Sequence, residues 1–157
     1  MEILLETNPL YPAHGPASLA GLIPLVFLCM RLLVTGIISR CGWVSFSNRH
    51  RASSRPSGTA YNCQVLTFGS WVRYKNAVRV IFTDSGVYFF PIVLFKLFHP
   101  PFMVPWASVV DFQMKDSLFG PYAWLEINDP VGRIRIRLTA KAENNLVKYR
   151  EVMRLSG

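Results

Sequence analysis

The sequence predicts one N-terminal membrane helix followed by a small, mainly β domain that ends in a helix. Three observations support this: an apolar stretch at residues 19–38, a series of short strand-like segments between residues 61 and 138, and a helical pattern at 141–155. We therefore divide the chain into an N-terminal arm (1–18), a membrane helix (19–39), a basic linker (40–60) and the β domain with its helix (61–157).

The apolar stretch is long enough to cross a bilayer. Twelve of its twenty residues are Leu, Ile, Val or Phe, and its one charge is Arg31. A hydrocarbon core about 30 Å thick needs roughly 20 such residues. A buried core helix would leave little of the chain to surround it. A signal peptide would begin with Lys or Arg, and residues 1–18 contain neither. We therefore expect a membrane-spanning helix.

The flanks of this helix predict its orientation. No Lys or Arg precedes it, whereas Arg40, Arg49, Arg51 and Arg55 follow it closely. The positive-inside rule places the C-terminal side in the cytoplasm and the N-terminus outside. We expect these four arginines to contact anionic lipid head groups. Trp43 stands where an interfacial aromatic anchor is expected.

Arg31 has two interpretations. Ionisable residues inside membranes usually face a partner helix or a water-filled cavity. Alternatively, the side chain reaches toward the cytoplasmic surface along its own helix. The subunit hypothesis stated below favours contact with a partner helix.

The segment at 45–59 is expected to be a linker. It is rich in Ser and Arg, contains Pro56 and Gly58, and has no hydrophobic period. It is interpreted as a solvated tether, as a basic strip on lipid head groups, or as both.

Short strands follow, with turns at 83–86 and 128–132. The alternation RIRIRL at 133–138 predicts one buried face and one basic, solvent-exposed face. At 141–155, Ala142, Leu146, Tyr149 and Met153 recur at helical spacing, so this helix should pack one stripe on the core. We expect strands at 61–68 (continued by 71–74), 78–82, 87–90, 102–104, 108–114, 122–127 and 133–138.

Several motifs carry a family resemblance. FKLFHPP at 95–101 is followed by Val104-Pro105-Trp106, and Gly42-Trp43 stands after the membrane helix. This pattern resembles small bacterial membrane-anchored proteins of unassigned function, in which a pleckstrin-homology-like (PH-like, GRAM-like) domain follows one helix. The resemblance spans about residues 40–138. It implies about seven antiparallel strands capped by a C-terminal helix, in a bacterial inner-membrane protein, and it implies no ligand site.

The proline-rich part of this motif has two interpretations. Pro100 and Pro101 remove backbone donors, so the stretch is an edge strand or a crossing loop. Its apolar side chains either pack in the core or form a loop that touches the bilayer or a partner protein. The residues proposed for that loop are Phe95, Phe98, His99, Pro100, Pro101, Phe102 and Trp106.

Motifs for catalysis are missing from the sequence. No glycine-rich phosphate loop or nucleophile elbow is found, and Cys29, Cys41 and Cys63 lack metal-ligand spacing. The chain carries 17 basic and 9 acidic residues, but the bases are dispersed without a nucleic-acid motif. We expect no enzyme, catalytic residue, metal, cofactor or small-molecule substrate, and no nucleic-acid partner.

Two functions then remain open. The first is an accessory or scaffold subunit of a larger inner-membrane complex, which contacts lipids and other membrane subunits. By analogy with small one-helix subunits, that complex is expected to be energy-transducing, photosynthetic or respiratory. The second is a free-standing membrane adaptor that binds anionic lipid head groups or a peptide.

Overall fold

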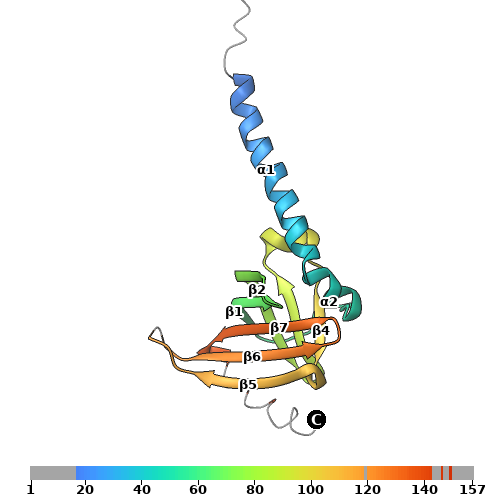
Figure 1. Ribbon diagram of the computed structural model, residues 1–157, viewed down its shortest axis with the longest axis vertical. Helices are drawn as coiled ribbons and strands as arrows, with labels where there is room; N and C mark the ends of the chain where they lie inside the picture. Colours follow the sequence, from blue (N-terminus) through green and yellow to red (C-terminus); the bar gives the residue numbers. More distant parts are fainter. Residues whose placement is uncertain (1–16, 119, 143–145, 147–148, 150–157) are drawn as a thin grey trace, which may run out of the picture. The chain divides into compact units, whose positions relative to one another are not determined.

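A computed structural model of the chain describes residues 17–118, 120–142, 146 and 149 (Figure 1). The chain divides into two units, Met1–Val34 and Thr35–Gly157. The boundary falls inside the first helix, so residues 35–40 of that helix belong to the second unit.

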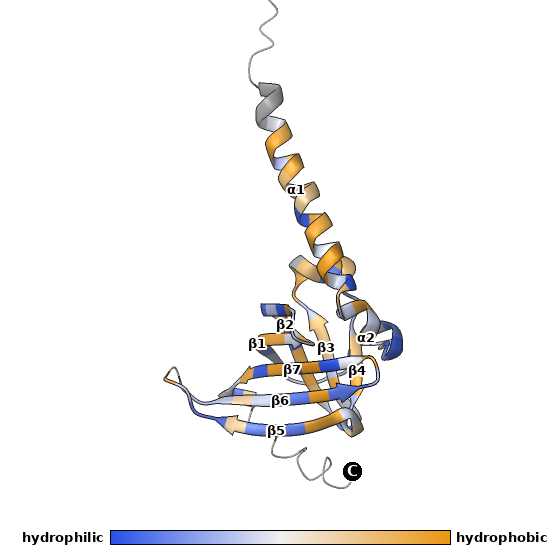
Figure 2. Cartoon of the chain, in the orientation of Figure 1, coloured by the Kyte–Doolittle hydropathy of each residue, from blue (hydrophilic) through white to orange (hydrophobic). Residues whose placement is uncertain are grey.

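The N-terminal helix α1 spans Ala17–Arg40, which confirms the helix expected at 19–39. Its side chains are mostly apolar (Figure 2) and exposed, from Leu22 to Ile38. The stretch Gly21–Arg40 is long and apolar enough to cross a membrane, and a signal sequence near an N-terminus has the same properties. Pro24 lies within the helix, near its N-terminal end.

The second unit is built on one curled antiparallel sheet of seven strands (Figure 1). The strand order is β4-β3-β2-β1-β7-β6-β5, so β1 pairs with both β2 and β7, while β4 and β5 lie at opposite edges of the sheet. The strands are β1 Ala60–Phe68, β2 Val72–Thr83, β3 Gly86–Pro91, β4 Phe102–Pro105, β5 Val109–Lys115, β6 Tyr122–Asp129 and β7 Gly132–Thr139.

These strands match the expected ones, with one difference in β2. The segments expected separately at 71–74 and 78–82 belong to a single strand. Lys75 and Asn76 interrupt the hydrophobic pattern between them. Asn76 has φ 50°, a left-handed conformation that asparagine tolerates better than most residues, and the strand continues through it.

The linker expected at 40–60 contains a helix, which corrects that prediction. Helix α2 spans Trp43–Arg49, and Trp43 and Phe46 on it are buried in the core. The segment looks polar because the serines and arginines around these two aromatics outnumber them. Burial of two large aromatic side chains is enough to fold so short a segment onto the sheet.

The core fills the inner face of the curled sheet. Three short 3₁₀ helices, η1 Val93–Phe98, η2 Trp106–Ser108 and η3 Ala140–Ala142, connect or follow the strands. Ala142, Leu146 and Tyr149 are buried, in agreement with the expected stripe. The expected helix at 141–155, with Met153, lies mostly outside the described residues.

Candidate membrane-proximal site

The last turn of α1 is joined to the β domain by buried hydrogen bonds. Ser39, which is 1 % exposed, donates its hydroxyl hydrogen bond to the carbonyl oxygen of Phe98 in η1. The Tyr74 hydroxyl on β2 donates to the Ile38 carbonyl over 3.3 Å. These contacts fix residues 35–40 against two separate parts of the domain.

His99 extends this network. Its Nε2 lies 2.9 Å from the Tyr74 hydroxyl, and the tautomer of His99 sets which of the two groups donates. Burial lowers the pKa of His99, and a backbone hydrogen bond with Phe95 offsets part of that effect. Burial also raises the pKa of the Tyr74 phenol. Both groups are therefore neutral near pH 7 and act as a hydrogen-bonded pair.

The hydrogen-bonded contacts of Ser39, Trp43, Tyr74 and His99 are here called the joint. Trp43 is its aromatic centre and is 0 % exposed. Its Nε1–H donates to the carbonyl of Pro100 over 2.7 Å, which satisfies the indole. This burial does not fit the predicted role of Trp43 as an interfacial anchor. The prediction rests on the position of Trp43 just after the apolar stretch. The turn at Cys41-Gly42 instead directs its side chain into the core. Its ring contacts Phe68, Tyr74, His99 and Phe102 with centroid distances of 5.9, 5.8, 5.1 and 5.0 Å.

Gly42 makes this turn possible. Its φ is 150°, and a Cβ there would lie 2.7 Å from the Cβ of Phe68. Only glycine allows the backbone to come this close to the first strand.

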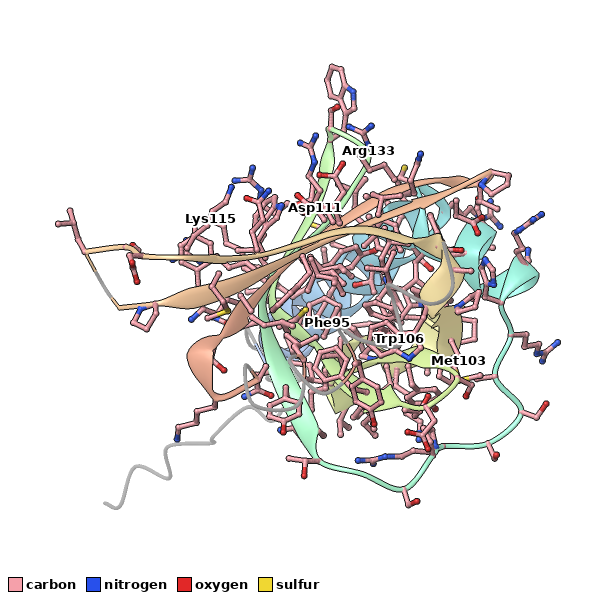
Figure 3. All side chains as sticks on the ribbon, turned by 90° about the horizontal axis from the view of Figure 1, so that it is seen from below. Phe95, Met103, Trp106, Asp111, Lys115 and Arg133 are labelled. Carbon is pink, nitrogen blue, oxygen red and sulfur yellow. The ribbon has the colours of Figure 1, made fainter. Side chains whose placement is uncertain are left out.

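The proline-rich motif is divided between core and surface. His99, Phe102 and Trp106 are buried, so they are not available for the loop contact predicted for them. Trp106 donates from Nε1 to the carbonyl of Thr83 over 2.8 Å, and Figure 3 shows it among the interior side chains. Phe95 and Pro101 are half-buried. Phe98 and Pro100 are exposed.

The exposed part of this region is η1. Val93 is 90 % exposed and Leu97 is 71 % exposed, with Lys96 exposed between them. Because Ser39 holds Phe98, these apolar side chains lie beside the end of α1. Exposed apolar side chains at such a place are suited to contact lipid or protein.

The predicted basic linker is partly neutralised by Asp129. This carboxylate, on β6, accepts a hydrogen bond from His50 over 2.8 Å and lies 3.3 Å from Nε of Arg49. It also accepts from the Val131 backbone N–H over 3.1 Å, as the predicted turn requires. Burial acts to raise the pKa of Asp129, but the hydrogen bonds from Val131 and His50 and the charges of His50 and Arg49 lower it overall.

The other candidate arginines lie at the surface. Arg40, Arg51 and Arg55 are exposed, and Arg55 lies 4.5 Å above the ring of Phe90. Arg31 is exposed on α1, near the middle of the stretch that could span a membrane.

A second basic surface, here called the basic face, lies on the outer side of the sheet. Cross-strand pairing brings together side chains of β2, β7 and β5 around the acids Asp111 and Glu126. Figure 3 shows Arg133, Asp111 and Lys115 on one side of the sheet, away from Phe95 and Trp106. The basic face comprises Arg73, Lys75, Lys115, Arg133, Arg135 and Arg137.

Aromatic side chains and one acid hold parts of the basic face in place. Arg137 lies 3.9 Å above the ring of Tyr122, and Nε of Arg133 lies 3.1 Å from Glu126. Such exposed contacts contribute little to stability.

Sequence reasoning identified Trp43, Phe98, His99 and Pro100 but missed their partners. Ser39 lies within the predicted apolar helix and Tyr74 within a predicted strand, so the local pattern marks neither as a site residue. Among the described residues, no group of three or more His, Cys, Asp or Glu is placed to hold a metal ion.

Comparisons with protein-family models, with curated proteins and with solved structures give no match for this chain. The site is therefore interpreted from its own geometry.

Proposed function

We propose that this protein is a non-enzymatic accessory or scaffold subunit of a larger bacterial inner-membrane complex. In this proposal α1 spans the membrane, the N-terminus is outside, and the β domain is cytoplasmic. We also propose that the curled sheet is PH-like, a proposal that its seven antiparallel strands and the burial of Leu146 and Tyr149 support.

The joint at the end of α1 is the observation that carries the proposal. A free adaptor gains from a flexible tether, because its domain must search the membrane surface for ligands. Here α1 passes into α2 through a two-residue turn. Ser39 and Trp43 donate to carbonyls of the domain, and Tyr74 of β2 donates to the Ile38 carbonyl at the end of α1. Residues 35–40, held against the domain by buried hydrogen bonds, suit a subunit more than a domain on a flexible tether.

The position of Arg31 supports a protein neighbour in the membrane. A charge at the centre of a bilayer costs about 2.5–3.5 kcal/mol by insertion scales. Such residues usually face other helices or water. Arg31 lies near the middle of Gly21–Arg40, where reaching either surface is hardest.

The basic face favours a second candidate function, that of a lipid-binding adaptor. Its bases outnumber its acids, and each well-placed base adds about 1 kcal/mol of attraction to an anionic leaflet. Attraction of this kind is screened over about 8 Å at physiological ionic strength. The two candidates therefore differ in their response to salt.

The test is purification of the tagged full-length chain from native membranes in mild detergent. A subunit should retain its partners on the resin through a high-salt wash, because apolar contacts are not screened. Arg31→Leu should reduce partner recovery, while Arg31→Lys should retain most of it. Carbonate extraction checks that both variants remain in the membrane.

Two outcomes would contradict the subunit proposal. One is elution of every co-purifying protein by salt, which favours the adaptor. The other is unchanged partner recovery with Arg31→Leu, which would indicate that Arg31 only reaches toward the membrane surface.

A further inference from the structure

An open pocket of about 410 Å³ lies where three turns of the second unit meet. The turns are the α1–α2 turn at Cys41-Gly42, the β1–β2 turn at residues 69–71 and the β6–β7 turn at 131–132. The Gly69 N–H donates to the Arg133 carbonyl over 2.8 Å and ties two of these turns together. The volume is within the range of small-molecule sites, which begins at about 300 Å³.

The walls of the pocket are apolar and its rim is amphipathic. Phe46, Phe68, Val72 and Val131 line the interior. At the rim stands Trp71, which is 93 % exposed. A large aromatic side chain left this exposed in a soluble environment is unusual, whereas Trp is enriched at the level of lipid head groups.

The rim also carries positive charge. Arg133 lines the pocket with a half-exposed side chain, and Glu126 holds its Nε from the neighbouring strand. Among the residues that line the pocket, Arg133 is the charged one, and it is exposed.

We propose that this pocket binds one anionic phospholipid of the cytoplasmic leaflet. The apolar walls would take part of an acyl chain, Trp71 would lie at the glycerol level, and Arg133 would face the phosphate. This inference rests on the proposed membrane orientation of α1.

The location of the pocket favours lipid as its occupant. Cys41 and Gly42, which line it, directly follow Arg40, the last residue of the stretch that could span a membrane. Under the proposed orientation the pocket mouth is therefore at the membrane surface, where lipids are at high local concentration. Arg133 at its rim favours an anionic head group over a zwitterionic one.

Cys41 provides a native reporter inside the pocket. It is an exposed free thiol, Cys63 is buried, and Cys29 can be removed as Cys29→Ser. The rate of Cys41 modification by N-ethylmaleimide, an uncharged reagent, is measured on this full-length variant in nanodiscs. One set contains phosphatidylcholine alone, and the other also contains phosphatidylglycerol.

Phosphatidylglycerol should slow the modification of Cys41 by about tenfold, the factor expected when roughly nine-tenths of the sites are occupied. Arg133→Gln should remove most of this protection. Arg137→Gln is the matched control, because it removes the same charge from the same strand outside the pocket. It should leave the protection nearly unchanged.

Three results would overturn the proposal. Equal loss of protection with Arg133→Gln and Arg137→Gln would indicate general surface charge. Equal protection by phosphatidylcholine would exclude an anionic ligand. Protection seen only in native membranes, and lost in both kinds of nanodisc, would indicate a partner protein instead. Carbonate extraction of native membranes that contain the full-length chain tests separately whether it is a membrane protein. Release of the chain by carbonate would contradict the proposed function rather than the pocket.

Discussion

The joint and the basic face of the same domain use polar side chains in opposite ways. In the joint, Ser39, Tyr74 and His99 are buried and each has a defined hydrogen-bond partner. On the basic face, the arginines and lysines are exposed or half-buried, and their contacts include the Arg137–Tyr122 ring contact and the Arg133–Glu126 ion pair. Buried polar groups are costly unless they are paired, so they specify one geometry. Exposed charges specify little, but they remain available to a ligand.

Replacing Trp43, the aromatic centre of the joint, should have the largest effect on stability. Trp43→Ala should lower the free energy of unfolding by about 3–5 kcal/mol, because it leaves a large cavity and an unpaired Pro100 carbonyl. Urea unfolding of the full chain in detergent measures this. Trp71→Ala is the matched control and should change stability by less than about 0.5 kcal/mol, because Trp71 is exposed. Equal losses in the two variants would show that Trp43 is not a core residue.

Asp129→Ala should have the next largest effect, about 2 kcal/mol at pH 7, because it leaves His50 and Arg49 without their acceptor. The pKa of Asp129 is lowered from its ordinary 3.8. Its contribution is therefore complete above pH 3.8 and is lost as the pH falls through the lower pKa of the folded state. The stabilities of the two proteins should converge in acid. A constant difference at all pH values would contradict this account.

His99 should give the joint a pH dependence at milder acidity. Its pKa is lowered from 6.5 by burial, so the unfolded chain binds more protons than the folded one just below that pH. Stability should therefore be complete above pH 6.5 and should fall as the pH drops toward the folded pKa. Unfolding curves of the native chain and of His99→Gln check this. The variant should be less stable overall but should lack this pH-dependent loss. If stability changed with pH equally in the native chain and in His99→Gln, the pH dependence would come from another group.

Changes on the basic face should have the smallest effect. Arg73→Gln with Lys75→Gln should alter stability by less than about 0.5 kcal/mol, since both side chains are exposed. Partner recovery in mild detergent should also be unchanged if the chain is a subunit. Reduced recovery of the co-purifying proteins with this double variant would favour the lipid adaptor.

Local patterns predicted most of the fold but not the joint. The alternation at 133–138 and the apolar stretch at 19–38 depend only on neighbours in sequence, and both correspond to observed elements. The joint depends on pairs such as Ser39 with Phe98, which lie 59 residues apart. Nothing in the local pattern distinguishes Trp43, which is buried, from Trp71, which is exposed. Tertiary contacts alone decide which tryptophan enters the core.

A distance measurement between spin labels tests the rigid joint most directly. The labels are placed at Ile37→Cys, near the end of α1, and at Lys75→Cys on β2, after Cys29 and Cys41 are replaced by serine. Both sites are exposed, and the remaining Cys63 is buried. Electron–electron double resonance on the full chain in nanodiscs should give one narrow distance distribution. A broad distribution, as expected for a domain on a flexible linker, would contradict the rigid joint and, with it, the basis for the subunit proposal.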